Sequence, residues 1–136
     1  MWLCLPPVIF CLLDQGFTLL NQTGTYWGGR YFEALESNPV AFPLLSRHPL
    51  FFVTGIAIWI ILFLVLIVWL PMRPAMIVSI GITFGHVWGA GGWVMNCSVM
   101  PRCPYTTSYG HGISLALILL AAILIVVAFE KTHLVK

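Results

Sequence analysis

The chain of 136 residues is 60% hydrophobic and 7% charged, with a mean hydropathy of +1.00 and a net charge of +2. A soluble domain carries about 25% charged residues, so these charges are too few to cover a water-facing surface. We therefore expect the lipid bilayer to be the main solvent. The small net charge excludes nucleic acid as a partner, and the length fits a single transmembrane domain, residues 1–136.

Four apolar segments are long enough to cross a bilayer, because a helical span needs about 20 residues. We predict spans at approximately 2–20, 51–70, 74–95 and 112–130. The first span has the length of a signal peptide, but it lacks a basic start and a small-residue cleavage site, so we keep it as a span. The predicted fold is an all-α integral membrane four-helix bundle.

Prolines mark the ends of the predicted helices. Pro6 and Pro7 open the first helix, and Pro49 opens the second, because a proline in a first turn loses no hydrogen bond. Pro71 and Pro74 force a tight hairpin, so the second and third helices are expected to be antiparallel neighbours.

The connector between the first two spans is long for a segment without structure. Within it, the stretch 30–36 has Tyr31, Phe32 and Leu35 on one side and its two glutamates elsewhere, which predicts a short interfacial helical segment. Asn38 followed by Pro39 is typical of the start of another short helix.

The first span carries a carboxylate, Asp14, into the membrane, where a charge costs at least a few kcal/mol. Thr18 lies on the same helical face and can donate a hydrogen bond, and His86 is the one other ionisable residue deep in a span. We expect these three residues to form an intramembrane polar cluster. It acts either as a structural clamp or as a site for a proton, a metal or a substrate. Three residues near the membrane ends are candidate companions: Glu36, Asn38 and His111.

Familiar catalytic and metal-binding patterns are absent from the sequence. The chain has no nucleophile elbow, phosphate-binding loop, dinucleotide fingerprint or paired-cysteine zinc pattern, so we predict no catalytic residues. The carboxylates and histidines named above have no recognisable metal spacing, so a metal site stays undefined.

The third span carries glycines at helical spacing along one face: Gly81, Gly85, Gly89 and Gly92. Small residues on one face allow another backbone to approach closely, which is how helices associate in lipid. We predict a helix-packing face, with its partner in this chain or in another subunit. His86 lies about 100° around the helix from this face.

The loop before the last span contains Cys97 and Cys103, which predict a disulfide if the loop faces an oxidising compartment. Arginine and lysine are balanced across the membrane and give no positive-inside signal. The cysteine pair and the basic end, with Lys131 and Lys136, favour cytoplasmic termini.

Two short patterns follow one another in the first third of the chain: Asp14-x-x-x-Thr18 and Glu36-x-Asn38-Pro39. They resemble an uncharacterised family of small prokaryotic membrane proteins, in which an intramembrane Asp with Thr is followed by Glu-Ala-Asn-Pro. The resemblance covers roughly residues 8–45 and departs at Ser37. It implies a prokaryotic inner (cytoplasmic) membrane and groups these residues as a unit, but it carries no activity.

Three functions fit these features. The first is an accessory subunit that packs into and stabilises a larger membrane complex without catalysis of its own. The second is an anchor that handles protons, haem b or a quinone through His86, His111 and Asp14. The third is a small homo-oligomeric transporter or channel with Asp14 lining the path, and a membrane-embedded hydrolase is the remaining class.

Overall fold

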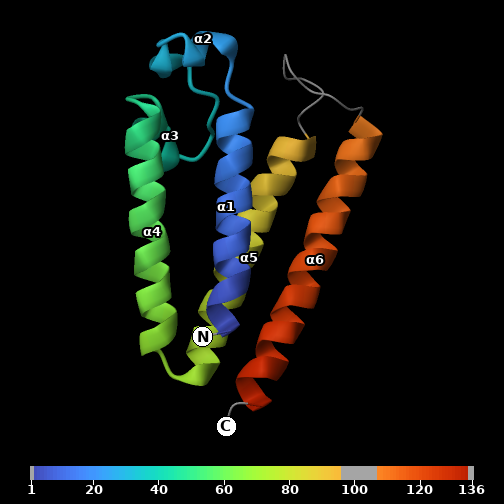
Figure 1. Ribbon diagram of the computed structural model, residues 1–136. Coiled ribbons are helices and arrows are strands. Elements are labelled where there is room, and N and C mark those ends of the chain that lie inside the picture. Colours follow the sequence, from blue (N-terminus) through green and yellow to red (C-terminus); the bar gives the residue numbers. More distant parts are fainter. Residues whose placement is uncertain (1, 96–106, 135–136) are drawn as a thin grey trace.

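The computed structural model describes residues 2–95 and 107–134 and forms an all-α bundle (Figure 1). The bundle contains four long helices: α1 (Leu5–Leu20), α4 (Pro49–Trp69), α5 (Met72–Met95) and α6 (Thr107–Leu134). A 3-10 turn, η1 (Trp2–Cys4), extends α1 at its start. The predicted four-helix architecture is confirmed.

Each of the four long helices contains a segment that is long and apolar enough to cross a membrane: Trp2–Leu20, Pro49–Trp69, Met72–Met95 and Tyr109–Thr132. The protein is therefore a small polytopic membrane protein. The second and third helices begin two residues earlier than the predicted spans, because Pro49 and Pro74 lie inside the first turns. Proline in a first turn lacks only an N–H that has no helical partner.

The start and the end of α4 are both set locally. The His48 side chain caps the start, since its Nδ1 accepts a hydrogen bond from the Leu50 backbone N–H at 3.1 Å. At the other end, Leu70 is extended because a residue that precedes proline avoids helical geometry. The chain then turns at Pro71 directly into α5, so α4 and α5 form the predicted antiparallel hairpin (Figure 1).

The connector between α1 and α4 contains the predicted helical segment in three short pieces: α2 (Gly24–Trp27), the 3-10 turn η2 (Tyr31–Glu33) and α3 (Ala41–Leu45). Within 30–36, only the three residues of η2 are helical. Asn38 lies just before α3, where its side-chain oxygen accepts from the Val40 and Ala41 backbone N–H groups at 2.9 and 3.4 Å.

The helices pack unevenly around the bundle. α5 packs extensively on both α1 and α6, whereas α4 makes few contacts with α1 and α5. One apolar cluster joins the hairpin end of α4 to α1 and α5, through Phe63, Cys11 and Ala75. Another joins its first turns to the connector, through Phe52 and Tyr26. A space lies between the first half of α4 and the second half of α5, next to the connector.

Candidate functional site

Asp14 on α1 faces His86 on α5. The Asp14 Oδ2 atom lies 2.8 Å from His86 Nδ1, and both side chains are largely buried, with 13% and 14% of their surfaces exposed. Asp14 lies six residues before the end of α1, which is roughly 9 Å inside the span at 1.5 Å per residue. The structure therefore brings together the two ionisable residues that lie deepest in the predicted spans.

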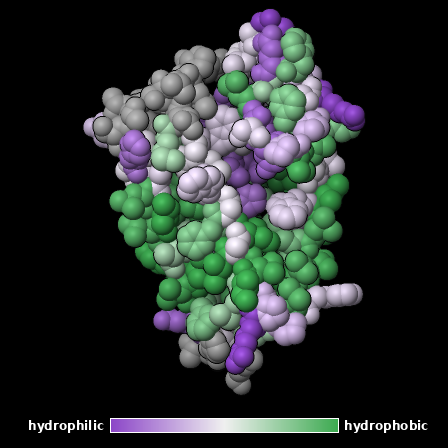
Figure 2. Space-filling view, turned by 180° about the vertical axis from the view of Figure 1, so that it is seen from behind, coloured by the Kyte–Doolittle hydropathy of each residue, from purple (hydrophilic) through white to green (hydrophobic). Residues whose placement is uncertain are grey.

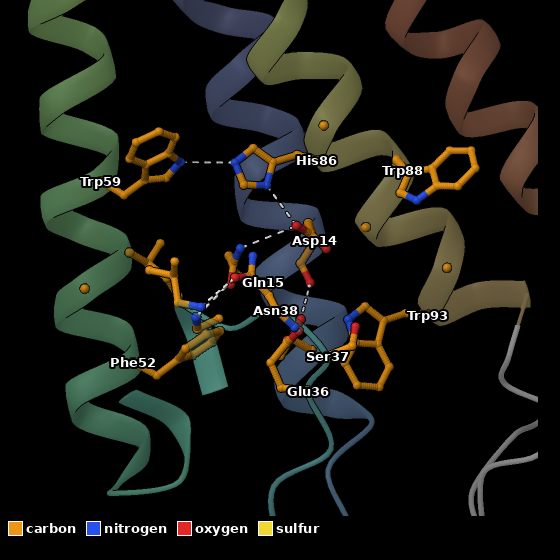
Figure 3. A pocket seen from close by; sticks show the side chains of 18 of the residues that line it. Asp14, Gln15, Glu36, Ser37, Asn38, Phe52, Trp59, His86, Trp88 and Trp93 are labelled. Atoms are coloured by element: carbon orange, nitrogen blue, oxygen red, sulfur yellow. Dashed lines mark hydrogen bonds and ion pairs between the residues drawn. The ribbon is translucent and has the colours of Figure 1, made fainter. Parts of the chain in front are cut away.

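Trp59 on α4 extends this contact to a third helix. Its indole Nε1 donates a hydrogen bond to His86 Nε2 at 3.2 Å. Because an indole nitrogen only donates, His86 Nε2 is the acceptor of this bond. In the tautomer that suits both contacts, the His86 Nδ1–H donates to Asp14 Oδ2 (Figure 3).

Two neighbours on α1 complete the surroundings of Asp14. Gln15 Nε2 approaches Asp14 Oδ2 at 3.4 Å, so it is a second and longer donor to the same oxygen. Thr18 does not donate to the carboxylate as its spacing suggested. Its hydroxyl instead bonds the Asp14 backbone carbonyl at 3.1 Å, which is the local bond that threonine makes one turn later in a helix.

The glycine face of α5 lies opposite Asp14. A Cβ atom on Gly89 would come within 2.5–2.8 Å of the Asp14 carboxyl atoms, so only glycine leaves room for this carboxylate. At Gly81, Gly85 and Gly92 a Cβ atom would meet nothing within 4 Å. All three glycines line a cavity, and among the described residues no helix packs closely on Gly81 or Gly85.

The cavity lies between α4 and α5 and has a volume of about 1220 Å³. Asp14, Gln15 and Thr18 contribute from α1, while Trp59 and His86 contribute from α4 and α5. Figure 2 shows the side of the bundle opposite to that in Figure 1, where hydrophilic residues lie in a recess at the upper border of the apolar band. The polar cluster is thus accessible from a cavity within the membrane-spanning part of the protein.

The connector closes one end of this cavity with Glu36, Ser37 and Asn38, which lie below Asp14 in Figure 3. The Glu36 carboxylate accepts a hydrogen bond from the Asn38 backbone N–H at 2.7 Å. Burial raises the pKa of Glu36 above its ordinary value, and the nearby Asp14 adds to this rise. The hydrogen bond from the Asn38 backbone N–H opposes the rise in the pKa of Glu36 without cancelling it.

Two buried residues that the sequence did not single out hold this connector in place. The Gln22 side chain bonds both backbone groups of Leu35, each at 2.8 Å, and thereby fixes the residue before Glu36. Tyr26 is fully buried, and its hydroxyl donates to the Leu45 carbonyl at 3.1 Å. A polar residue just after a span, as at Gln22, is a weak signal, because such positions are usually hydrated.

The remaining predicted site residues lie elsewhere. His111 is exposed on α6 and does not line the cavity. Cys97 and Cys103 lie outside the described residues, while Cys4 and Cys11 are free thiols. Within residues 2–95 and 107–134, no group of three His, Cys, Asp or Glu side chains is placed to hold a metal ion.

The proposed haem ligand, His86, uses both ring nitrogens in hydrogen bonds, so an iron atom would have to displace Trp59 to reach Nε2. No protein family, curated protein or solved structure matches the chain. The functional argument therefore rests on the geometry of the cavity.

Proposed function

We propose that the protein is a small membrane transporter whose substrate path passes through the cavity between α4 and α5. The observation that carries this proposal is the position of Asp14 and His86, a hydrogen-bonded pair within the spans that borders a cavity of about 1220 Å³. Ionisable residues inside a membrane are costly, and they commonly mark substrate and proton paths. A structural clamp alone would need no such space beside it.

The loose attachment of α4 supports this proposal. α4 makes few contacts with α1 and α5, and the Trp59–His86 bond is one of them, so a change in its distance from α5 would break few contacts. A transporter needs a helix that moves relative to a fixed binding site, so that the site opens to each side in turn.

A cysteine introduced at Gly85 tests this function without knowledge of the substrate. Gly85 lines the cavity, and a Cβ atom there meets nothing within 4 Å, so Gly85→Cys is compatible with the fold. In proteoliposomes, a membrane-impermeant maleimide is expected to label this cysteine when it is added on either side of the membrane. Labelling from one side only, or from neither side, contradicts a transport path.

Two controls accompany this experiment. The unmodified chain gives the background from its own cysteines. Ile61→Cys, on an exposed part of α4 that does not line the cavity, should stay unlabelled because lipid covers it.

The accessory-subunit function remains the second candidate because a Cβ atom on Gly81 or Gly85 would meet no described residue within 4 Å. A helix of a partner protein could enter the gap and pack on Gly81 and Gly85. Such a partner would co-purify in mild detergent and would protect Gly85→Cys from the maleimide. A chain that is stable and monodisperse alone in detergent argues against this candidate.

A further inference from the structure

We infer that the cavity binds a lipophilic organic cation, namely an ammonium or phosphonium group that carries apolar substituents. The inference deepens the proposed transport function and rests on it for the cavity's role as a substrate site. It follows from the charge, the lining and the opening of the cavity.

The side chains that line the cavity are acidic and not basic, apart from His86. Asp14 and Glu36 both line it, and none of its described lining residues is Lys or Arg. His86 is the one other titratable residue among them, and both of its ring nitrogens are used in the contacts to Asp14 and Trp59. The lining residues from α4 add no titratable group. An ionised carboxylate here has no Lys or Arg partner in the lining, and a bound cation supplies a positive charge.

The rest of the lining suits the apolar part of such a ligand. Phe52, Trp59 and Trp93 are arranged around the carboxylates in Figure 3, and aliphatic side chains such as Leu44 and Ile56 fill the intervals. Aromatic rings attract organic cations through their faces and also provide apolar contact. A small inorganic cation would prefer a site made only of oxygen ligands.

The opening of the cavity indicates where the ligand comes from. On the face shown in Figure 2, the recess lies at the upper border of the apolar band and opens to the side of the bundle, so a ligand can reach it from the bilayer. The shared chemistry, a cation with an apolar body, occurs both in free lipophilic cations and in lipids with an amine headgroup.

The test uses the full chain in nanodiscs made of phosphatidylglycerol alone, which contains no amine. The probe is radiolabelled tetraphenylphosphonium, and tetraphenylborate serves as the control because it has the same shape and the opposite charge. After subtraction of empty nanodiscs, the phosphonium is expected to bind saturably. Absence of saturable binding, or equal binding of the borate, overturns the proposal.

Two glutamates in the connector provide a matched pair of variants. Glu36→Gln removes a carboxylate that lines the cavity and is expected to weaken phosphonium binding about tenfold. Glu33→Gln removes a carboxylate three residues earlier that bonds Arg30 and Thr25 and does not line the cavity, so binding should be unchanged. Equal affinities of these two variants contradict the proposal. Asp14→Asn should abolish binding, and Glu36→Gln keeps the test informative if that variant fails to fold.

Nanodiscs that also contain phosphatidylethanolamine identify the source of the ligand. If the lipid amine occupies the cavity, the apparent affinity for the phosphonium falls as its fraction increases, whereas unchanged affinity assigns the cavity to free cations. The labelling of Gly85→Cys separates this inference from the transport function. Two-sided labelling without phosphonium binding overturns the substrate class alone, and binding with one-sided labelling overturns transport alone.

Discussion

Trp59 determines the hydrogen-bonding pattern of the polar cluster, although it belongs to an otherwise apolar helix. Its N–H leaves His86 Nε2 one role, that of acceptor, and so fixes the His86 proton on the side of Asp14. The Asp14–His86 contact was predictable because few ionisable residues lie inside the spans. Trp59 was not predictable, because an indole in an apolar run is equally suited to lipid, and only the tertiary structure places it beside His86.

Replacing Trp59 with phenylalanine should therefore allow either ring nitrogen of His86 to carry the proton. In the unmodified protein, the ¹⁵N spectrum of His86 is expected to show a single neutral tautomer with the proton on Nδ1. Trp59→Phe should show both neutral tautomers and lower the free energy of unfolding by about 1 kcal/mol, which is typical of one hydrogen bond. Trp88→Phe is the control, since Trp88 is 82% exposed. An unchanged His86 spectrum in Trp59→Phe contradicts this assignment.

Glu36 should make the stability of the protein depend on pH. Because burial raises the pKa of Glu36 above 4.5, the folded chain keeps this proton over a range in which the unfolded chain has lost it. The contribution of Glu36 to the free energy of unfolding therefore falls as the pH rises from 4.5 through the raised pKa.

Thermal unfolding in detergent, measured from about pH 4 to about pH 8, tests this dependence. Glu36→Gln should flatten the curve and be more stable than the unmodified chain at the upper end of the range. Glu33→Gln should keep the original slope. A Glu36→Gln variant that keeps the slope contradicts the role given to Glu36.

At the scale of the helices, the glycines on one face of α5 have different neighbours. The sequence predicts that all of them are packing positions, because spacing alone shows only that they share a face. In the structure, Gly89 is in contact with Asp14, while Gly81 and Gly85 border open space. The difference arises because α4 stands away from α5 at this level, which no local pattern in either helix indicates.

A pair of alanine variants distinguishes these glycines. Gly89→Ala places a methyl group where the Asp14 carboxylate lies, and should destabilise the protein by about 1–3 kcal/mol and break the bond to His86. Gly85→Ala adds the same methyl group to open space, and it should leave the stability and the Asp14–His86 bond unchanged. Thermal unfolding and the His86 Nδ1–H signal provide the two measurements, and equal effects of the two variants would falsify the close contact at Gly89.

At the scale of the molecule, most of the architecture was predictable from composition and length. Four apolar segments separated by prolines and polar connectors allow few arrangements in a bilayer, so the bundle and the α4–α5 hairpin followed directly. The fold of the connector was less predictable. The Gln22 side chain hydrogen-bonds the backbone N–H and C=O of Leu35, so these groups are not available to a local helix. That interaction is also what brings Glu36 to the cavity.

The arrangement of the spans also predicts the sidedness of the chain. Since four helices are able to cross the membrane, both ends should lie on one side, as in Figure 1, where N and C lie at the same end of the bundle. Epitope tags at the two ends should respond alike to antibody added to intact vesicles. A tag inserted at Gly29, in the connector, should respond from the opposite side. Tags at the two ends that report opposite sides contradict the number of crossings.

The recess that opens to the side of the bundle has a consequence for how affinity would be measured. Occupancy of such a site follows the concentration of ligand dissolved in the bilayer, and this concentration depends on partitioning from water. Each additional methylene favours the bilayer by about 0.8 kcal/mol, or roughly fourfold. In a series of alkyltrimethylammonium ions, the apparent affinity referred to water should therefore rise about fourfold per carbon, whereas the affinity referred to the mole fraction in lipid stays constant.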